Sequence, residues 1–274
     1  EITKLAAEKE TKLVAKPGAA QLLRKALSNP RYKVKPIAIG TNTDPYQPIE
    51  KTHKIMRGVL EVLAEHNHPV TIVTKSALVV RDADILGPMG KLGLARVAIS
   101  LTSLDAKLSR TMEPRAAAPR RRLWAMRELN RAGCPVGVML APIIPALNDH
   151  EIEALAKAAA SHGATVASYI VLRLPLEVRD LFVEWLHTHY PDRAKRVMRY
   201  VREIHGGRDY DPEWGKRLAG QGVYADMLRR RFVRAARAEG LSTERTALRT
   251  DLFAPPASST PQLSFMAQLT TNEG

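Results

Sequence analysis

Five short apolar segments alternate with helical patterns along the chain, and this alternation limits the folds open to the sequence. They are residues 37–40, 70–74, 96–100, 136–140 and 166–171. Such runs are typical of buried parallel strands, and each ends in polar or proline-marked residues. Strands that alternate with helices imply parallel pairing through right-handed crossovers. The sequence therefore predicts an α/β fold, an open or closed barrel of parallel strands.

The chain divides into four regions around this alternation. We expect an N-terminal segment at residues 1–16, the barrel at 17–176, a helical region at 177–253 and a flexible tail, rich in Pro, Ser, Thr and Gln, at 254–274. Helices are expected near residues 19–28, 49–66, 119–132, 177–189, 192–204 and 224–239. Asn148 and Glu151 have the spacing of a capping box before a further helix.

The composition favours a soluble, cytoplasmic protein that attracts polyanions. No apolar run is long enough to cross a membrane, and the net charge of +14 raises affinity for nucleic acid. A generally basic proteome, or a need for solubility, is the alternative explanation of this charge. The single cysteine, Cys134, excludes an internal disulfide, and without a cysteine or histidine cluster around it no cysteine-built metal site is expected within these residues.

The predicted strand ends bring chemically useful side chains to one place. The carboxyl ends of parallel strands form the ligand-binding side of such folds. The residues at these ends are Gly40, Thr41, Asn42, Thr43, Asp44, Lys75, Ser100, Ser103, Ala141 and Arg173. Alternatively, Thr43 and Asp44 merely cap the next helix. Pro45 and Pro48 delay that helix, so the polar run is longer than a cap requires.

Two further groups of residues allow more than one role. Lys75 could be a Schiff-base nucleophile of a barrel lyase or aldolase, an anion partner, or a solvated side chain. Glu113 and Arg115 lie between a strand end and a helix whose first turn carries a run of arginines, residues 120–122. An arginine there suits a carboxylate or a phosphate. Alternatively, Glu113 and Arg115 pair with each other or with neighbours and hold the loop.

Four motifs in order resemble radical S-adenosylmethionine proteins, specifically a bacterial branch related to the spore photoproduct lyases. They are Gly-Thr-Asn-Thr-Asp-Pro-Tyr-Gln-Pro-Ile-Glu at 40–50, Val-Thr-Lys-Ser at 73–76, Met-Glu-Pro-Arg-Ala at 112–116 and Gly-Gly-Arg-x-Tyr-Asp-x-x-Trp-Gly at 206–215. The similarity runs from about Thr11 to Leu241.

The resemblance implies a partial six-stranded TIM-type barrel, a 4Fe-4S cluster, S-adenosylmethionine and an external electron donor. The implied reaction is reductive cleavage to a 5'-deoxyadenosyl radical that abstracts a hydrogen atom, in a lyase-like reaction on a DNA lesion. By position, Thr43 with its loop would meet the amino group of S-adenosylmethionine. Lys75 and Ser100 would contact its carboxylate and ribose, and Ala141 would line the adenosine site by its backbone. Glu113, Arg115 and Arg173 would complete the cofactor site.

The cluster requires a Cys-x3-Cys-x2-Cys loop after the first strand of the family, and this sequence has none. Cys134 begins a later strand and cannot replace three thiolates. We expect that loop and the first strand to lie upstream of residue 1. Alternatively, this member has lost the chemistry and is a nucleic-acid-binding protein on the same scaffold.

Nucleic acid is the partner we expect. The helix at 224–239 carries Arg229, Arg230, Arg231, Arg234 and Arg237, and Arg208 lies in the preceding loop. These charges could instead form an ordinary solvated face. In the tail, Gln262, Leu263, Ser264 and Phe265 resemble the short peptide with which bacterial repair proteins bind the sliding clamp, although a tail without function is the alternative.

Overall fold

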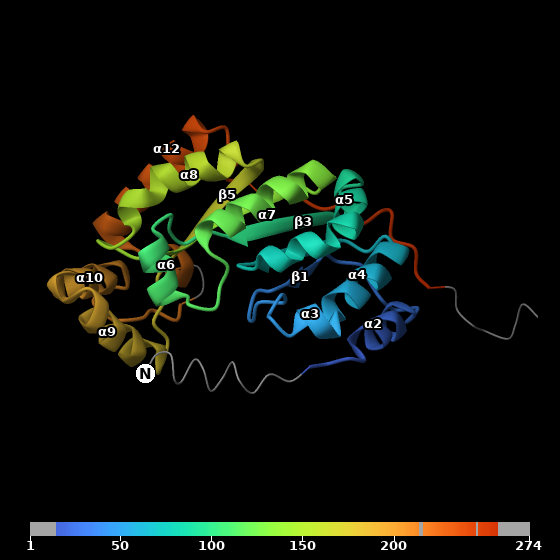
Figure 1. The fold of residues 1–274 in the computed structure, drawn as a ribbon, viewed down its shortest axis with the longest axis horizontal. Coiled ribbons are helices and arrows are strands. Elements are labelled where there is room, and N and C mark those ends of the chain that lie inside the picture. Colours follow the sequence, from blue (N-terminus) through green and yellow to red (C-terminus); the bar gives the residue numbers. More distant parts are fainter. Residues whose placement is uncertain (1–14, 214–215, 245, 257–274) are drawn as a thin grey trace, which may run out of the picture.

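A parallel sheet forms the centre of the computed structural model, which describes residues 15–213, 216–244 and 246–256 (Figure 1). Its strands are β1 (Ile37–Ile39), β2 (Val70–Thr74), β3 (Ala95–Ser100), β4 (Val136–Ile143) and β5 (Ala164–Val171). The described part of the chain contains these five strands, which pair in chain order and all in parallel. The predicted α/β fold, a partial barrel, is confirmed.

Helices follow each strand and cover one face of the sheet. Those associated with the strands are α2 (Ala19–Leu27), α3 (Glu50–His53), α4 (Ile55–Glu65), the 3-10 helix η1 (Ala77–Asp82), α5 (Ala83–Lys91), α6 (Ala106–Met112), α7 (Pro119–Ala132), the 3-10 helix η2 (Asp149–Glu151) and α8 (Ile152–Ser161). The single helix expected over residues 49–66 is two helices, because Lys54 adopts a left-handed backbone with φ of 49° between them.

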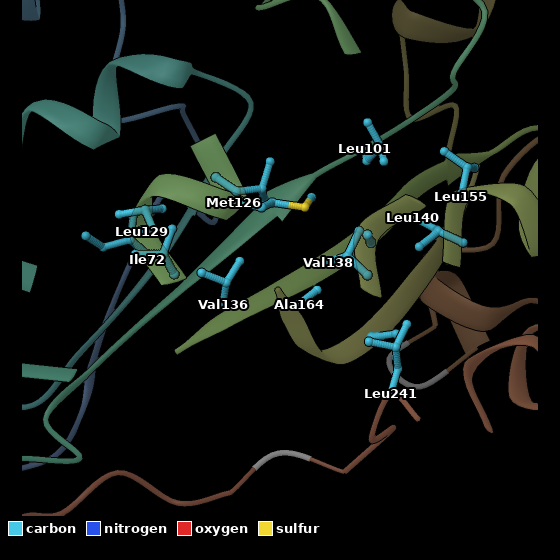
Figure 2. Packing of buried hydrophobic residues seen from close by; sticks show 14 of the residues in the cluster. Ile72, Leu101, Met126, Leu129, Val136, Val138, Leu140, Leu155, Ala164 and Leu241 are labelled. Atoms are coloured by element: carbon cyan, nitrogen blue, oxygen red, sulfur yellow. The ribbon is translucent and has the colours of Figure 1, made fainter. Parts of the chain in front are cut away.

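The main core lies between the sheet and its covering helices. Figure 2 shows Ile72 and Val136 of the strands packed beneath Met126 and Leu129 of α7. All four side chains are completely buried. Removing such side chains from water is the largest favourable contribution to folding, about 1.5–3 kcal/mol for each.

The opposite face of the sheet, the inner face of the partial barrel, is less covered by the described residues. Along β2 the buried side chains alternate with half-buried ones, and β3 repeats the pattern. In β1 the residue on this face is exposed. The side chains concerned are those of Ala38, Thr71, Val73, Arg96 and Ala98. The inner face is therefore the open side of the sheet.

The C-terminal helices lie beyond and beside the carboxyl ends of the strands (Figure 1, left). They are α9 (Val178–His189), α10 (Pro191–Ile204), α11 (Lys216–Ala219) and α12 (Gly222–Ala238). A second core joins α6, α9 and α10 to the ends of β4 and β5, with Leu108, Leu172 and Trp185 among its buried members. Phe232 of α12 packs on Tyr169 of β5, with ring centroids 4.7 Å apart. The three long helices match their predicted positions closely.

The segment after α12, which we call the strap (residues 241–244 and 246–256), returns across the amino ends of the strands. Ser242 exchanges backbone hydrogen bonds with the start of β5, to Thr165 O at 2.9 Å and from Ala167 N at 2.8 Å. Further along, Arg249 N donates to Gly93 O at 3.0 Å and Ala254 N donates to His66 O at 2.9 Å. Most of the predicted flexible tail, residues 257–274, lies outside the described residues, as does the sliding-clamp motif at 262–265.

Candidate functional site

The loop after β1 begins at a position that only glycine can occupy. Gly40 has a φ of +89°, and a Cβ atom there would lie 2.0 Å from the carbonyl oxygen of Val73. The next three residues, Thr41, Asn42 and Thr43, are exposed. The absence of a side chain at Gly40 thus lets the loop cross directly over the end of β2.

Asp44 fastens this loop to the end of β2. Its Oδ1 accepts hydrogen bonds from Thr74 Oγ1 at 2.7 Å and from the backbone N–H of Tyr46 at 2.9 Å. Its Oδ2 accepts the backbone N–H of Lys75 at 2.7 Å. The alternative in which Asp44 caps the following helix is wrong, since both its oxygens bind elsewhere and α3 has no side-chain cap.

A buried network of charged and polar side chains holds the same loop in place. The Asp82 carboxylate, with no exposed surface, accepts hydrogen bonds from the Tyr46 hydroxyl at 3.0 Å and from Arg81 at 2.8 and 2.9 Å. Arg81 also donates to the carbonyl oxygen of Glu50 at 2.6 Å. Burial raises the pKa of Tyr46 above its ordinary value, and the Asp82 charge raises it further. The hydroxyl therefore remains a donor, and the loop is held rigidly.

Glu113 is the centre of the site. One carboxylate oxygen accepts a hydrogen bond from the Lys75 ammonium, and the other accepts one from Arg122 Nη2 at 2.6 Å. Thr102 Oγ1 lies 3.2 Å from both oxygens. Burial by itself would raise the pKa of Glu113, but the charges of Lys75 and Arg122 outweigh it and hold the pKa below its usual range. Glu113 is therefore a carboxylate with only 10% of its side chain exposed, and it stays ionised.

Arg122 links this carboxylate to the strand ends. Only 1% of its side chain is exposed. Its Nε donates to Ala117 O at 2.6 Å and its Nη1 donates to Ser100 O at 3.0 Å. The first turn of α7 is thus joined both to the end of β3 and to the loop that carries Glu113.

The ends of β3 and β4 are joined by side chains that bind backbone carbonyls. Ser100 Oγ and Thr102 Oγ1 donate to Ala141 O at 3.0 and 2.9 Å. Asn148 Nδ2 donates to Thr102 O at 2.8 Å, and Asn148 Oδ1 accepts the N–H of Ile144 at 2.6 Å. The predicted capping box is wrong, because Asn148 spans the two strand ends instead of capping a helix.

Glu151, the other half of the expected capping box, also binds the loop after β3. Its carboxylate accepts hydrogen bonds from Ser103 Oγ at 2.7 Å and from the N–H of Leu104 at 2.6 Å. The Ser103 hydroxyl is therefore part of the scaffold that holds the strand ends in place.

The structure brings together part of the predicted site. Direct hydrogen bonds connect Asp44, Lys75, Ser100, Glu113 and Ala141 through Thr74, Arg122 and Thr102. Arg115 is exposed two residues beyond Glu113, and Arg173 is half-buried after β5. Arg173 has no hydrogen bond to the Lys75–Glu113 group among those that the structure describes. Of the predicted pairing of Glu113 and Arg115, the Glu113 part is confirmed, with Lys75 and Arg122 as its partners.

The predicted nucleic-acid residues lie apart from this group. Arg208 is exposed in a loop that Asp209 fastens to Arg179 at 2.8 Å and to Arg202 at 2.7 Å. A cavity of about 670 Å³ on the exposed face of α12 is lined by Arg229, Arg230, Val233, Arg234, Arg237 and Ala238. Arg229 pairs with Asp226 at 2.9 Å, and Arg231 pairs with Glu153 at 2.7 Å.

The described residues do not provide a metal centre. They contain no group of three or more His, Cys, Asp or Glu side chains that could hold a metal ion. Cys134 is buried, and burial raises the pKa of its thiol to about 12. No helix in the described part of the chain is long and apolar enough to cross a membrane.

Known proteins resemble this chain in sequence. A family model described as the Radical SAM superfamily matches residues 11–159. An uncharacterized protein of Mycobacterium tuberculosis is 33% identical over 224 residues, which are 81% of this chain and 62% of the relative. An uncharacterized protein of Methanocaldococcus jannaschii is 30% identical over 115 residues, 42% of this chain and 43% of the relative. The chain thus spans about 62% of the length of its mycobacterial relatives.

Solved structures share the fold at low sequence identity. Spore photoproduct lyase complexed with dinucleoside spore photoproduct has a TM-score of 0.56 at 16% identity, covering 82% of this chain and 64% of that chain. A mutant of this lyase with bound AdoMet and dinucleoside spore photoproduct also has a TM-score of 0.56 at 16% identity, covering 83% of this chain and 66% of that chain. At this identity the likeness establishes the fold.

Proposed function

This chain belongs to the radical S-adenosylmethionine superfamily, and from this membership we propose that its barrel mouth binds S-adenosylmethionine for radical chemistry on a nucleic acid. When bound, this cofactor supplies the superfamily with an adenosyl radical that abstracts a hydrogen atom. The observation that carries the proposal is the Lys75–Glu113 group at the carboxyl ends of the strands. The likeness of the fold to a lyase structure with bound AdoMet supports it.

The polar groups at the mouth match the chemistry of the cofactor. Lys75 donates to Glu113 through one N–H, and 36% of its side chain remains exposed, so its ammonium has further donors for a carboxylate. The exposed loop of Thr41, Asn42 and Thr43 offers oxygen acceptors for the amino group, whereas the Ser100 hydroxyl is buried and already donates to Ala141 O at 3.0 Å. Lys75 and this loop would bind and orient the amino-acid half of S-adenosylmethionine.

The iron–sulfur cluster does not fit the described residues. A 4Fe-4S cluster is held by thiolates, and Cys134 is a buried thiol with a raised pKa. Cysteines for a cluster would have to come from outside these 274 residues, since Cys134 is the only cysteine among them. We therefore assign no step of the chemistry to a cluster held by this chain.

The nucleic-acid part of the proposal is supported by charge. The net charge is +14, and Arg230, Arg234 and Arg237 of α12 make no ion pair within the described residues. The dinucleoside spore photoproduct in the matching lyase structures is consistent with a DNA-lesion substrate. Repair of a damaged base, in a lyase-like reaction, is the activity we propose.

The ion pair of Lys75 argues against a Schiff-base lyase. Lys75 lies in an ion pair with Glu113, whereas a lysine nucleophile is typically desolvated in an apolar pocket or set beside another cation. Borohydride in the presence of carbonyl substrates should leave Lys75 unmodified.

The decisive experiment is an iron and sulfide assay on the full-length protein as the cell makes it, purified without oxygen, followed by assay of S-adenosylmethionine cleavage under reducing conditions. Roughly four irons per chain, with thiolate-to-iron absorption and adenosyl product, would support the proposal. Absence of iron and of cleavage, with retained nucleic-acid binding, would leave a binding protein on the same scaffold and would refute the enzyme.

A further inference from the structure

We propose that a basic surface on α6 and the start of α7 binds a strand of the nucleic acid where it enters the barrel mouth. This surface, which we call the rim surface, consists of Lys107, Arg110, Arg120, Arg121 and Trp124. Its four cations are exposed and Trp124 is half-buried. The proposal rests on the proposed nucleic-acid substrate and names the surface that would guide it.

The positive charge of the rim surface exceeds the negative charge of the carboxylates near it. The carboxylates of the same segment are Asp105 and Glu113. Asp105 accepts the backbone N–H of Lys107 at 2.7 Å as the cap of α6, and Glu113 is occupied by Lys75 and Arg122. The four rim cations make no ion pair with any carboxylate of the described residues. Such a surface attracts phosphates.

An aromatic side chain lies among these charges. The guanidinium of Arg121 stacks over the Trp124 ring, 4.2 Å from its centroid. Planar guanidinium and indole groups are the platforms on which unpaired bases stack, while neighbouring cations follow the phosphates. The combination fits a nucleic-acid strand better than it fits a simple anion.

The rim surface borders the proposed cofactor site. Arg120 and Arg121 directly precede Arg122, whose Nη2 binds Glu113, which in turn binds Lys75. Figure 1 shows α6 beside the start of α7 at the carboxyl ends of the strands. The cavity on α12 lies elsewhere, because that helix runs from the mouth toward the strap and the amino end of β5. Of the two basic surfaces, the rim surface is the one at the carboxyl ends of the strands, so we assign to it the strand that delivers a base to the site.

The far half of α7 provides a matched control. Arg127 and Arg131 lie on the same helix, but both form ion pairs with Glu128 at 3.2 Å. The variants Arg120→Glu/Arg121→Glu and Arg127→Glu/Arg131→Glu change the net charge equally. Any difference between them therefore reports position and not total charge.

The test measures binding of a short fluorescein-labelled single strand, and of the matching duplex, by anisotropy over a range of salt concentrations. Arg120→Glu/Arg121→Glu should weaken single-strand binding at least about tenfold and reduce the salt slope by about 1.4, at roughly 0.7 per lost phosphate contact. Trp124→Ala should weaken binding more than Trp124→Phe does. Arg120→Gln/Arg121→Gln, with a melting curve for each variant, separates lost contacts from misfolding.

Each outcome decides a different point. If the parent chain binds and the rim variant loses no more affinity than Arg127→Glu/Arg131→Glu, the rim surface is refuted while the nucleic-acid substrate stands. If the parent chain binds neither strand nor duplex, the proposed substrate fails and the rim surface fails with it.

Discussion

Lys75 and Glu113 form an ion pair that joins the end of β2 to the loop before α7, across 38 residues of sequence. The same carboxylate also binds Arg122, so Glu113 pairs with two cations whose side chains differ greatly in solvent exposure. The Lys75 side chain is 36% exposed, whereas that of Arg122 is 1% exposed. This asymmetry assigns a structural role to Arg122 and leaves Lys75 accessible to a ligand.

Substitutions of the two cations should separate these roles. Arg122→Met leaves Glu113 without its buried partner and should destabilise the fold by about 3–5 kcal/mol. Lys75→Met should change stability by about 1 kcal/mol or less, because a partly exposed pair contributes little, yet it should weaken S-adenosylmethionine binding at least about tenfold. Urea denaturation and calorimetric titration measure the two effects. A Lys75→Met variant that binds the cofactor as tightly as the parent would contradict the assignment.

Because of Glu113, the free energy of unfolding should depend on pH. Its pKa in the folded protein is lowered, so the ionised form stabilises the fold above the ordinary glutamate pKa of about 4.3. That contribution is lost as the pH falls from there through the folded-state value. The free-energy difference between the parent and Glu113→Gln, from urea denaturation, should therefore be constant at neutral pH and shrink in this acidic range. A free-energy difference between parent and variant that grows as the pH falls would contradict the lowered pKa of Glu113.

Gly40 should be intolerant of any side chain. With φ at +89° and a Cβ only 2.0 Å from Val73 O, Gly40→Ala must displace the loop from the end of β2. We expect a loss of about 3 kcal/mol or more, with weakened cofactor binding. Gly207→Ala is the control, since its φ is +86° but no atom lies within 4 Å of the added Cβ. Its loss should be about 1–2 kcal/mol from backbone strain alone. Equal melting temperatures for the two variants would refute the steric argument.

The exposed arginines of α12 should contribute to nucleic-acid affinity independently of the cofactor site. Arg230→Glu/Arg234→Glu should weaken oligonucleotide binding about tenfold and flatten its salt dependence. Arg229→Glu/Arg231→Glu reverses as much charge, but these arginines are already paired with Asp226 and Glu153. Anisotropy titrations of both variants should show the larger loss for the unpaired arginines. The reverse order would favour an ordinary solvated face.

The fold could be predicted because its signals are local. Apolar strands and amphipathic helices show their periodicity in the sequence, so the strands and the long helices were placed to within a few residues. The short helix α6 was not predicted, and the break at Lys54 is a second exception. The sequence around it favours a continuous helix, yet Lys54 has a left-handed backbone, and the N–H of Met56 just after it binds the carboxylate of Glu50, six residues before Met56, at 3.1 and 3.2 Å.

The site could be predicted only in part, because its partners are distant in sequence. The position of Lys75 after a strand indicated a functional residue, but nothing local indicates that Arg122 contacts Glu113 or that Asp82 lies beneath Tyr46. Asn148 and Glu151 have the spacing of a cap, yet both bind the segment after β3. Buried polar groups need hydrogen-bond partners. The connections between the strands determine which residues lie close enough to provide them.

The strap affects how the protein matures on the ribosome. Its backbone joins the amino ends of β5 and β2, yet it is synthesised after every strand of the described sheet. Protein synthesis adds roughly 5–20 residues per second. Several seconds therefore pass after the last strand is made before Ala254 is available to hydrogen-bond with His66. During that interval the hydrogen bonds between the strap and the amino ends of the strands have not yet formed. We therefore expect the nascent sheet to need protection by a chaperone most at that stage.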